Sequence, residues 1–227
     1  PAHGKCARYA HSDIIMRIPI AKEGYPFIVP LLGITVIISF ISLKGAVAPA
    51  ILTLFVIYFF RDPERTIPSE AGLVVSPADG LIIDIRDIPD ENLMGGESVC
   101  VSIFLSIFNV HVNRIPCKGK VIETIYNSGK FLPAYREKAS SLNEQNSLVI
   151  GHKNIKIVVR QIAGLIARRI ICRVEKGSQV ARGERFGLIR FGSRVDLFVP
   201  KEVELVIKKG DKVAGGKTVI GKIKDPL

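Results

Sequence analysis

The sequence predicts an α+β protein that is predominantly β, with a compact, barrel-like β core preceded by a hydrophobic helical hairpin. Two long runs without a charged side chain lie near the N-terminus. After residue 63 the chain changes to short β-like runs broken by Gly, Pro, Asn and Asp, and two of these runs repeat one glycine spacing. A chain of 227 residues can form one full domain with an appendage. We expect an N-terminal membrane-associating segment at residues 1–62 and a β-rich domain at residues 63–227.

The two uncharged runs predict the helical hairpin. They cover residues 25–43 ("YPFIVPLLGITVIISFISL") and 45–60 ("GAVAPAILTLFVIYFF"), and only Lys44 separates them. About 20 apolar residues suit a tilted helix that crosses a bilayer, and the second run is somewhat shorter than that. The alternative is a buried helical pair in a soluble protein. It is disfavoured because a domain of this size has little protein with which to cover two helices that are apolar all round.

Basic residues flank the hairpin on both sides. Positive charge next to membrane segments marks the cytoplasmic side, so we expect the protein at the cell membrane with its larger part facing the cytoplasm. The second run ends without the small-residue cleavage site of a signal peptide. The flanking residues are Lys5, Arg8, Arg17 and Lys22 before the hairpin and Arg61 and Arg65 after it. We expect Arg61 and Arg65 to meet lipid headgroups.

The chain is strongly basic, with 32 Lys and Arg against 21 Asp and Glu and a net charge of +11. Such a balance favours a polyanionic partner, which can be nucleic acid, an anionic membrane surface or a phosphorylated substrate. Trp is absent and aromatic residues are few, so the sequence offers no stacking platform for single-stranded nucleic acid. The four cysteines lack C-x-x-C spacing, which indicates neither a zinc site nor a disulfide framework.

Short apolar runs rich in β-branched residues predict the strands of the core, and many are apolar enough to be buried on both faces. The runs are "GLVVSPADGLIIDI", "SVCVSIFLSIFNVHVNRIP", "GKVIETIYNSG", "NSLVIGHKNIKIVVRQIAGLIARRIICRV", "FGLIRFGSRVDLFVP" and "EVELVIKKG". Helix signals are few in this part of the chain. The best candidate covers residues 133–144.

One internal repeat lies near the C-terminus. "VEKGSQVARGERFGLI" and "IKKGDKVAGGKTVIGKI" share a frame that aligns Gly177 with Gly210 and Gly183 with Gly216. Each copy resembles the hairpins of small biotinyl and lipoyl β-barrels, in which glycine supplies tight turns. The repeat therefore favours a compact, barrel-like core.

Three polar islands interrupt the apolar runs and supply the candidate site residues. Asp79 lies in "SPADG", His111 in "NVHVNRIP", and Gly192 and Ser193 in "IRFGSRVDLFVP". Each island also has a purely structural interpretation. Asp before Gly is common in turns, and a glycine within a strand often marks a bulge. A histidine in a β core can be a buried residue whose ring nitrogens are hydrogen-bonded and which has no catalytic role.

An Asp, a His and a Ser can form a hydrolase triad. However, "FGSRV" lacks the G-x-S-x-G pattern, and no strand-to-helix turn follows Ser193. A serine after glycine has another use: its hydroxyl attacks the preceding carbonyl, the ester undergoes β-elimination, and the new terminal residue hydrolyses to a pyruvoyl group. That route needs a base and a strained or accessible glycine carbonyl. A membrane-tethered biotinyl-like carrier is a third possibility, but the chain lacks a Met-Lys-Met type of modification turn.

The number and order of several motifs resemble the phosphatidylserine decarboxylase family in its short, single-domain proenzyme form. The resemblance covers nearly everything after about residue 58 and includes "YFFRDPERTIP", "VVSPADG", "FLSIFNVHVNRIP", "GKFLPAYREKASSLNEQN", "QIAGLIARRI" and "GERFGLIRFGSRVDLFVP". It implies a carboxy-lyase of phospholipid biosynthesis that associates with membranes. Such an enzyme decarboxylates phosphatidylserine to phosphatidylethanolamine after autocatalytic cleavage, here at Gly192-Ser193.

The resemblance also implies roles for the polar islands. Ser193 would become the pyruvoyl cofactor, which forms a Schiff base with the substrate amine, and Gly192 would end the larger of two chains that remain a heterodimer. Asp79 and His111 match the acid and the imidazole that assist self-cleavage, and His111 is also the candidate for returning a proton to the substrate. No metal is implied. This chain has Arg114 where longer relatives have a second histidine.

The phosphate and the carboxylate of phosphatidylserine call for cations. Asn143 and Glu144 in "SSLNEQN" are expected to order a loop over the substrate. The expected substrate-binding arginines are Arg114, Arg168, Arg169 and Arg194.

Overall fold

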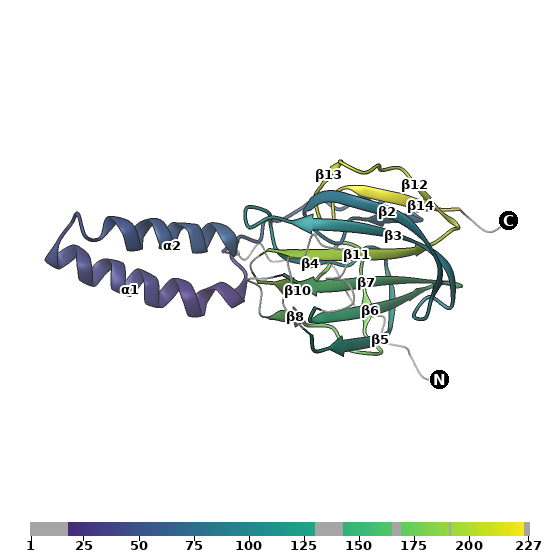
Figure 1. Cartoon of the computed structure of the whole chain (residues 1–227), viewed down its shortest axis with the longest axis horizontal. Coiled ribbons are helices and arrows are strands. Elements are labelled where there is room, and N and C mark those ends of the chain that lie inside the picture. Colours follow the sequence, from purple (N-terminus) through teal and green to yellow (C-terminus); the bar gives the residue numbers. More distant parts are fainter. Residues whose placement is uncertain (1–17, 130–142, 165–168, 191, 225–227) are drawn as a thin grey trace, which may run out of the picture.

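The computed structural model describes residues 18–129, 143–164, 169–190 and 192–224, and Figure 1 shows their arrangement. Two helices project from one end of a β-rich domain. After a 3-10 turn η1 (Lys22–Gly24), helix α1 covers Tyr25–Ile41 and helix α2 covers Val47–Phe59. The protein is therefore mostly β with an apolar helical hairpin, and the predicted fold class is confirmed at that level.

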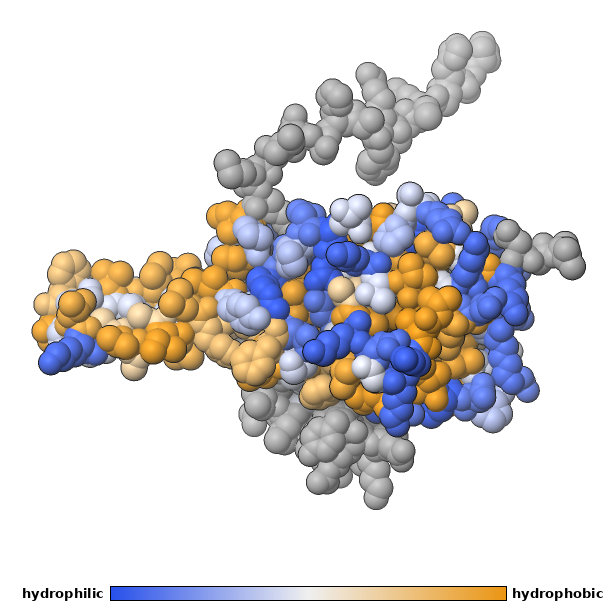
Figure 2. All heavy atoms as spheres, turned by 90° about the horizontal axis from the view of Figure 1, so that it is seen from above, coloured by the Kyte–Doolittle hydropathy of each residue, from blue (hydrophilic) through white to orange (hydrophobic). Residues whose placement is uncertain are grey.

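The hairpin presents a mostly apolar surface along its length (Figure 2). Phe40 is 87% exposed and Ile51 62% exposed. Between the helices, the hydroxyls of Thr35 and Thr53 lie 3.2 Å apart and share a hydrogen bond. The segment Lys22–Ile41 is long and apolar enough to cross a membrane, whereas α2 is shorter. So much apolar surface is unfavourable in water, and the hairpin is not a buried pair of core helices.

Fourteen strands form the β domain in the described part of the chain, and every pair is antiparallel. The strands are β1 (Leu73–Val75), β2 (Gly80–Glu91), β3 (Gly96–Leu105), β4 (Val112–Arg114), β5 (Gly119–Asn127), β6 (Gln145–His152), β7 (Ile155–Ala163), β8 (Ile170–Cys172), β9 (Gln179–Val180), β10 (Arg185–Ile189), β11 (Ser193–Pro200), β12 (Val203–Leu205), β13 (Lys212–Val213) and β14 (Val219–Ile223).

One large curled sheet and two small sheets enclose the core. The large sheet has the order β13-β2-β3-β11-β7-β6-β5-β9, and the small sheets have the orders β1-β14-β12 and β4-β10-β8. The core contains Val101 and Leu197 from the large sheet together with Ile220 of β14 and Ile189 of β10. Strand β11 runs through the middle of the large sheet, so its first residue is flanked by the ends of β3 and β7.

The sequence repeat is also a repeat of backbone geometry. The φ angles of Gly177 and Gly210 are +93° and +94°, and those of Gly183 and Gly216 are +77° and +76°. Side chains rarely adopt this region, which accounts for glycine at all four positions. Each copy places a two-residue strand, β9 or β13, before a five-residue strand, β10 or β14. The likeness of these hairpins to biotinyl and lipoyl domains stays a prediction.

The base of the hairpin packs onto the β domain. Phe59 and Phe60 at the end of α2 are fully buried in a cluster that includes Leu188 of β10. Just beyond them, the buried carboxylate of Asp62 accepts a hydrogen bond from Nε of Arg185 at 2.8 Å. The predicted division between residues 62 and 63 thus falls in a well-packed junction, and it stays a prediction.

Candidate active site

Ser193 is the first residue of β11, near the base of the helical hairpin (Figure 1). Its register partners are Leu105 of β3 and Ala163 of β7. The residue is fully buried, and its Oγ has no hydrogen-bond partner among the described residues. A buried hydroxyl without a partner costs about 1–3 kcal/mol, and Ser98 shares this feature, so it indicates function here only together with the residues beside it.

Gly192 precedes Ser193 with a φ of +68°. A Cβ added there would meet only Cγ2 of Ile107, at 3.9 Å, so the backbone conformation and not crowding requires glycine. The expected bulge is thus a left-handed turn that leads into β11. The Gly192 N–H donates a hydrogen bond to Nε2 of His111 at 3.4 Å. The Gly192-Ser193 bond therefore lies beside an imidazole.

His111 accepts this hydrogen bond because its other nitrogen carries the ring proton. Nδ1 lies 2.9 Å from the carbonyl oxygen of Asn109, which can only accept, so Nε2 has the free lone pair. The ring packs against Phe59, with centroids 4.2 Å apart. Burial, with a smaller contribution from the positive charge of Arg61, lowers the pKa of His111 to about 4. At neutral pH the imidazole is therefore uncharged and can accept a proton.

Asp79 forms no hydrogen bond with His111. Its carboxylate accepts two hydrogen bonds from Arg65, at 2.6 and 2.7 Å, and one from the N–H of Gly215 at 2.8 Å. The expectation that Arg65 meets lipid headgroups is wrong, because its side chain is only 10% exposed and neutralises this carboxylate. Asp79 acts on His111 through its charge alone, which opposes the lowering of the histidine pKa. The described residues form no Ser–His–Asp triad.

Two arginines that were expected to bind substrate are buried and bonded to the protein itself. Arg114 on β4 donates to two backbone carbonyl oxygens, each at 2.9 Å. Arg194 on β11 forms a two-pronged ion pair with Asp196, at 2.6 and 2.9 Å. Because successive side chains of a strand alternate, Arg194 points to the face opposite Ser193. Both guanidinium groups stabilise the fold, and a role in binding substrate stays a prediction.

Asn143 and Glu144 lie beside the strand end that pairs with Ser193. Nδ2 of Asn143 donates to the carbonyl oxygen of Ala163 at 2.7 Å, and the carbonyl of Glu144 accepts from the N–H of Ala163 at 2.9 Å. Both residues are buried, and neither is helical. The rest of the helix expected at residues 133–144 lies outside the described residues, as does Arg168. Arg169 is exposed and directly precedes β8.

A buried polar network behind β11 could not be found from the sequence pattern. Nε2 of Gln161 donates to Oδ1 of Asn113 at 2.8 Å, and Nδ2 of Asn146 donates to Oε1 of Gln161 at 3.2 Å. Gln161 is the register partner of Val195, which shares a strand face with Ser193. In the sequence, such a network appears only as a polar residue within an apolar run. Turns and edge strands contain polar residues as well, so this pattern does not distinguish them.

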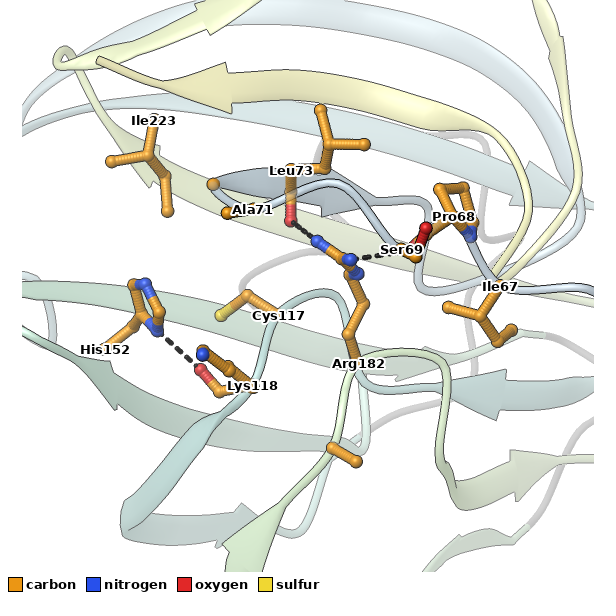
Figure 3. Close-up of a pocket in the computed structure, with 12 residues that line it drawn as sticks. Ile67, Pro68, Ser69, Ala71, Leu73, Cys117, Lys118, His152, Arg182 and Ile223 are labelled. Carbon is orange, nitrogen blue, oxygen red and sulfur yellow. Dashed lines mark hydrogen bonds between the residues drawn. The ribbon is translucent and has the colours of Figure 1, made fainter. Parts of the chain in front are cut away.

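A cavity of about 410 Å³ lies elsewhere in the β domain, and none of the candidate residues lines it (Figure 3). Arg182 points into it and donates to the carbonyl oxygens of Leu73, at 3.1 Å, and of Pro68. Burial raises the pKa of the Cys117 thiol in its wall to about 12, so this cysteine is not a nucleophile at neutral pH. The candidate chemistry therefore stays with Gly192 and Ser193.

The described residues contain no group of three or more His, Cys, Asp or Glu side chains that could hold a metal ion. Ser193 is fully buried, and the peptide bond that precedes it is part of the same turn. This arrangement favours a first reaction of the serine with the protein's own backbone, which is the step that defines the class of self-processing enzymes.

Comparison with known proteins identifies the family. A family model of phosphatidylserine decarboxylase matches residues 52–221. A phosphatidylserine decarboxylase proenzyme from Geobacter metallireducens is 47% identical over 210 residues, which cover 89% of this chain and 96% of the relative. Proenzymes of the same name are 47% identical over 208 residues in Ehrlichia chaffeensis (91% and 92% covered) and 45% over 213 residues in Symbiobacterium thermophilum (92% and 98%). The chain belongs to the phosphatidylserine decarboxylase family.

Proposed function

We propose that the chain is cut between Gly192 and Ser193 and that Ser193 becomes the pyruvoyl group of a membrane-associated enzyme. The family gives the reaction, in which a proenzyme cleaves itself and then decarboxylates phosphatidylserine to phosphatidylethanolamine. One observation carries the assignment to these residues. A glycine with positive φ precedes a buried serine hydroxyl that has no partner among the described residues, and a neutral histidine is hydrogen-bonded to the same turn.

Self-cleavage requires only atoms of the chain and one water molecule. Oγ of Ser193 loses its proton to a base and attacks the carbonyl carbon of Gly192, and the C–N bond breaks as the ester forms. Removal of the Cα proton of Ser193 then breaks its Cβ–O bond and releases Gly192 as a carboxylate. Water replaces the nitrogen of the remaining dehydroalanine, ammonia leaves, and a pyruvoyl group begins the chain of residues 193–227.

His111 is the base that we assign to self-cleavage. Nε2 is unprotonated and lies 3.4 Å from the backbone nitrogen of Gly192, one residue before the hydroxyl. A pKa of about 4 keeps this nitrogen free of a proton at neutral pH. Asp79 supports His111 from a distance, because its negative charge stabilises the imidazolium that forms when the proton arrives.

The surroundings of Ser193 fit the group that would replace it. The unpartnered Oγ shows that no hydrogen bond within the described part of the chain must be broken when the side chain loses its hydroxyl. A pyruvoyl group supplies an electrophilic carbonyl that takes up the electrons released as carbon dioxide leaves. His111 then holds the proton that returns to the substrate α-carbon. Asn143 and Glu144 fix the neighbouring end of β7.

The two chains should remain together without a covalent link. The small chain would begin with β11, which pairs with β3 along its whole length and with β7 from Ser193 to Phe198. Strand β13 pairs with β2, and β14 pairs with β1, so three strands of the small chain are built into sheets of the large chain. Separation would break all of these ladders, which supports a stable heterodimer.

We further propose that the β domain lies on the cytoplasmic surface of the membrane. Arg61 is half-buried at the base of the hairpin, where its guanidinium stacks on Tyr58 at 3.9 Å and donates to the carbonyl of Phe108 at 2.7 Å. Phe108 is itself exposed. A cation beside exposed aromatic rings suits the headgroup region of an anionic membrane, so the basic surface would serve lipid and not nucleic acid.

Intact mass under denaturing conditions tests the proposal. Wild-type protein should give two chains, and the smaller should be lighter than residues 193–227 by about 17 Da, the mass of the ammonia lost as the pyruvoyl group forms. Ser193→Ala should give one full-length, inactive chain. Ser98→Ala is the matched control, because Ser98 is also fully buried with a hydroxyl that has no partner in the described part of the chain, yet it lies at the other end of the β11 ladder. A cut Ser193→Ala chain, or active wild-type protein of full length, would refute the assignment.

A further inference from the structure

Antiparallel pairing brings Arg190 and Arg169 side by side. The register of β10 and β8 aligns residues 187–189 with residues 172–170, and at the next step the N–H of Arg190 donates to the carbonyl of Arg169 at 3.3 Å. Directly opposite residues of an antiparallel pair have Cβ atoms about 4.5–5.5 Å apart and point to the same face. The two arginines therefore project from one face of this small sheet.

That face carries the base of the helical hairpin. Leu188, two residues before Arg190, packs in the buried cluster with Phe59 and Phe60. Residues two apart on a strand share a face, so Arg190 points toward the hairpin as well. Its Cζ lies 5.1 Å from the ring centroid of Phe27, near the start of α1. The arginine pair thus lies where the β domain meets the helix that is long enough to cross a membrane.

No carboxylate forms a hydrogen bond or a close ion pair with either arginine within the described part of the chain. The charge of Glu23 acts on Arg190 from a distance, but both Glu23 oxygens are bound by Nη2 of Arg173, at 2.6 and 2.5 Å. Nε of Arg190 is buried without a partner among the described residues. Burial, followed by the charge of Arg169, lowers the pKa of Arg190. Like charges directly opposite each other destabilise a sheet, and a buried N–H donor without a partner destabilises it further. A bound anion would offset both effects.

The pair is also close to the bond that is cut. Arg190 precedes Gly192 by two residues and lies on the chain that leads into Ser193. In phosphatidylserine the phosphodiester is a few bonds from the amine that reacts, so an anion site adjoining Ser193 matches the spacing within the headgroup. The substrate carboxylate is a poorer candidate, because an ion pair with it would stabilise the ground state and oppose the loss of carbon dioxide.

We propose that Arg190 and Arg169 together bind the phosphodiester of the substrate headgroup and so orient its amine and carboxylate toward residue 193. This inference rests on the proposed function only for the identity of the substrate. Arginine suits the task because its planar fork can donate two parallel hydrogen bonds to one phosphate. Arg190 is the new member of the site, and its burial against Phe27 fixes the fork in place.

Binding to an uncut chain tests the proposal without any pyruvoyl group. The parent protein is full-length Ser193→Ala in dodecyl maltoside micelles, and the probe is dihexanoyl phosphatidylserine followed by ³¹P NMR. Arg190→Gln and Arg169→Gln should each raise the dissociation constant by about 10- to 100-fold, as expected for a lost charge-assisted hydrogen bond. The double variant Glu23→Gln/Arg173→Gln is the control, since it removes the neighbouring ion pair as a whole and frees no carboxylate beside Arg190, and it should change the constant less than twofold. Unchanged binding by Arg190→Gln would overturn the proposal.

Two further measurements distinguish a site for the substrate phosphodiester from a surface that attracts anionic lipid in general. In the matured enzyme, checked by intact mass, Arg190→Gln should raise KM by at least tenfold and lower kcat by less than about threefold, because positioning contacts act mainly on binding. If the pair serves anionic lipid in general, Arg190→Gln will instead reduce sedimentation with phosphatidylglycerol vesicles and leave the ³¹P result unchanged, which overturns the proposal. If wild-type protein is never cut, the proposed function fails, but the binding comparison still decides whether this pair holds a phosphodiester.

Discussion

Protonation of His111 should destabilise the uncut chain when the pH is lowered from 7 to 5. The folded protein holds the pKa of His111 at about 4, against 6.5 for an unperturbed histidine, because burial disfavours the charged ring. Between these two values the unfolded chain binds a proton that the folded chain does not, so the free energy of unfolding falls as the pH falls. The loss amounts to about 2 kcal/mol at pH 5 and about 3 kcal/mol below pH 4.

The assay compares two uncut proteins, Ser193→Ala and Ser193→Ala/His111→Asn. Each is unfolded by urea in detergent micelles at pH 7 and pH 5, with circular dichroism as the signal because the chain contains no Trp. Carboxylates titrate alike in both proteins and cancel in the difference. The histidine-containing protein should lose about 2 kcal/mol more than the asparagine variant between the two pH values.

Equal losses would refute the argument that burial keeps His111 neutral. An NMR titration of the Cε1 proton of His111 gives an independent check, since it should show a midpoint near 4 and not near 6.5. A His111 pKa of about 4 also predicts that the rate of self-cleavage is nearly constant from pH 8 to pH 5 and falls only when His111 becomes protonated.

Other substitutions test the backbone and the ion pair. Gly192→Ala should slow cleavage about tenfold by intact mass, because a left-handed φ costs an L-residue about 1–2 kcal/mol. Gly177→Ala has a similar φ and open space around it, and it should mature at the wild-type rate. Gly183→Ala should lower the free energy of unfolding by about 2 kcal/mol more than Gly177→Ala, because its Cβ would lie only 2.4 Å from a side-chain carbon, and equal effects would contradict the packing argument. Arg65→Met should cost about 3 kcal/mol in chemical denaturation by leaving the carboxylate of Asp79 unpaired, and adding Asp79→Asn should recover part of that loss.

The helical hairpin and the repeat were predictable from the sequence because both depend on local patterns. The two uncharged runs correspond to α1 and α2. The repeated glycine spacing corresponds to φ angles that agree within 1° between Gly177 and Gly210 and between Gly183 and Gly216. Local patterns cannot specify which strands become neighbours. The order of the eight-stranded sheet, in which β11 lies between β3 and β7, depends on contacts between distant parts of the chain.

The same limit applies to the site. The sequence singled out His111, Gly192 and Ser193 as candidates, and the structure places the histidine against the glycine. It could not show that Arg65 neutralises Asp79, because that pair joins a loop after α2 to the turn before β2. Arg190 was missed for a related reason. Its neighbour Arg169 is far away in sequence, and only the register of β10 and β8 reveals that two arginines lie opposite each other without a counter-ion among the described residues.

One contact joins the hairpin to the chemistry of the β domain. The ring of His111 is buried partly by Phe59, the last residue of α2, and burial is the main reason that its imidazole is neutral. On the neighbouring face, Arg190 packs over Phe27 of α1. The hairpin therefore supplies one wall of the candidate site as well as a large apolar surface. Under the proposed function, a substrate held in the bilayer by its acyl chains would bring its headgroup to that wall, and His111, the proposed base, lies at the same end of the domain.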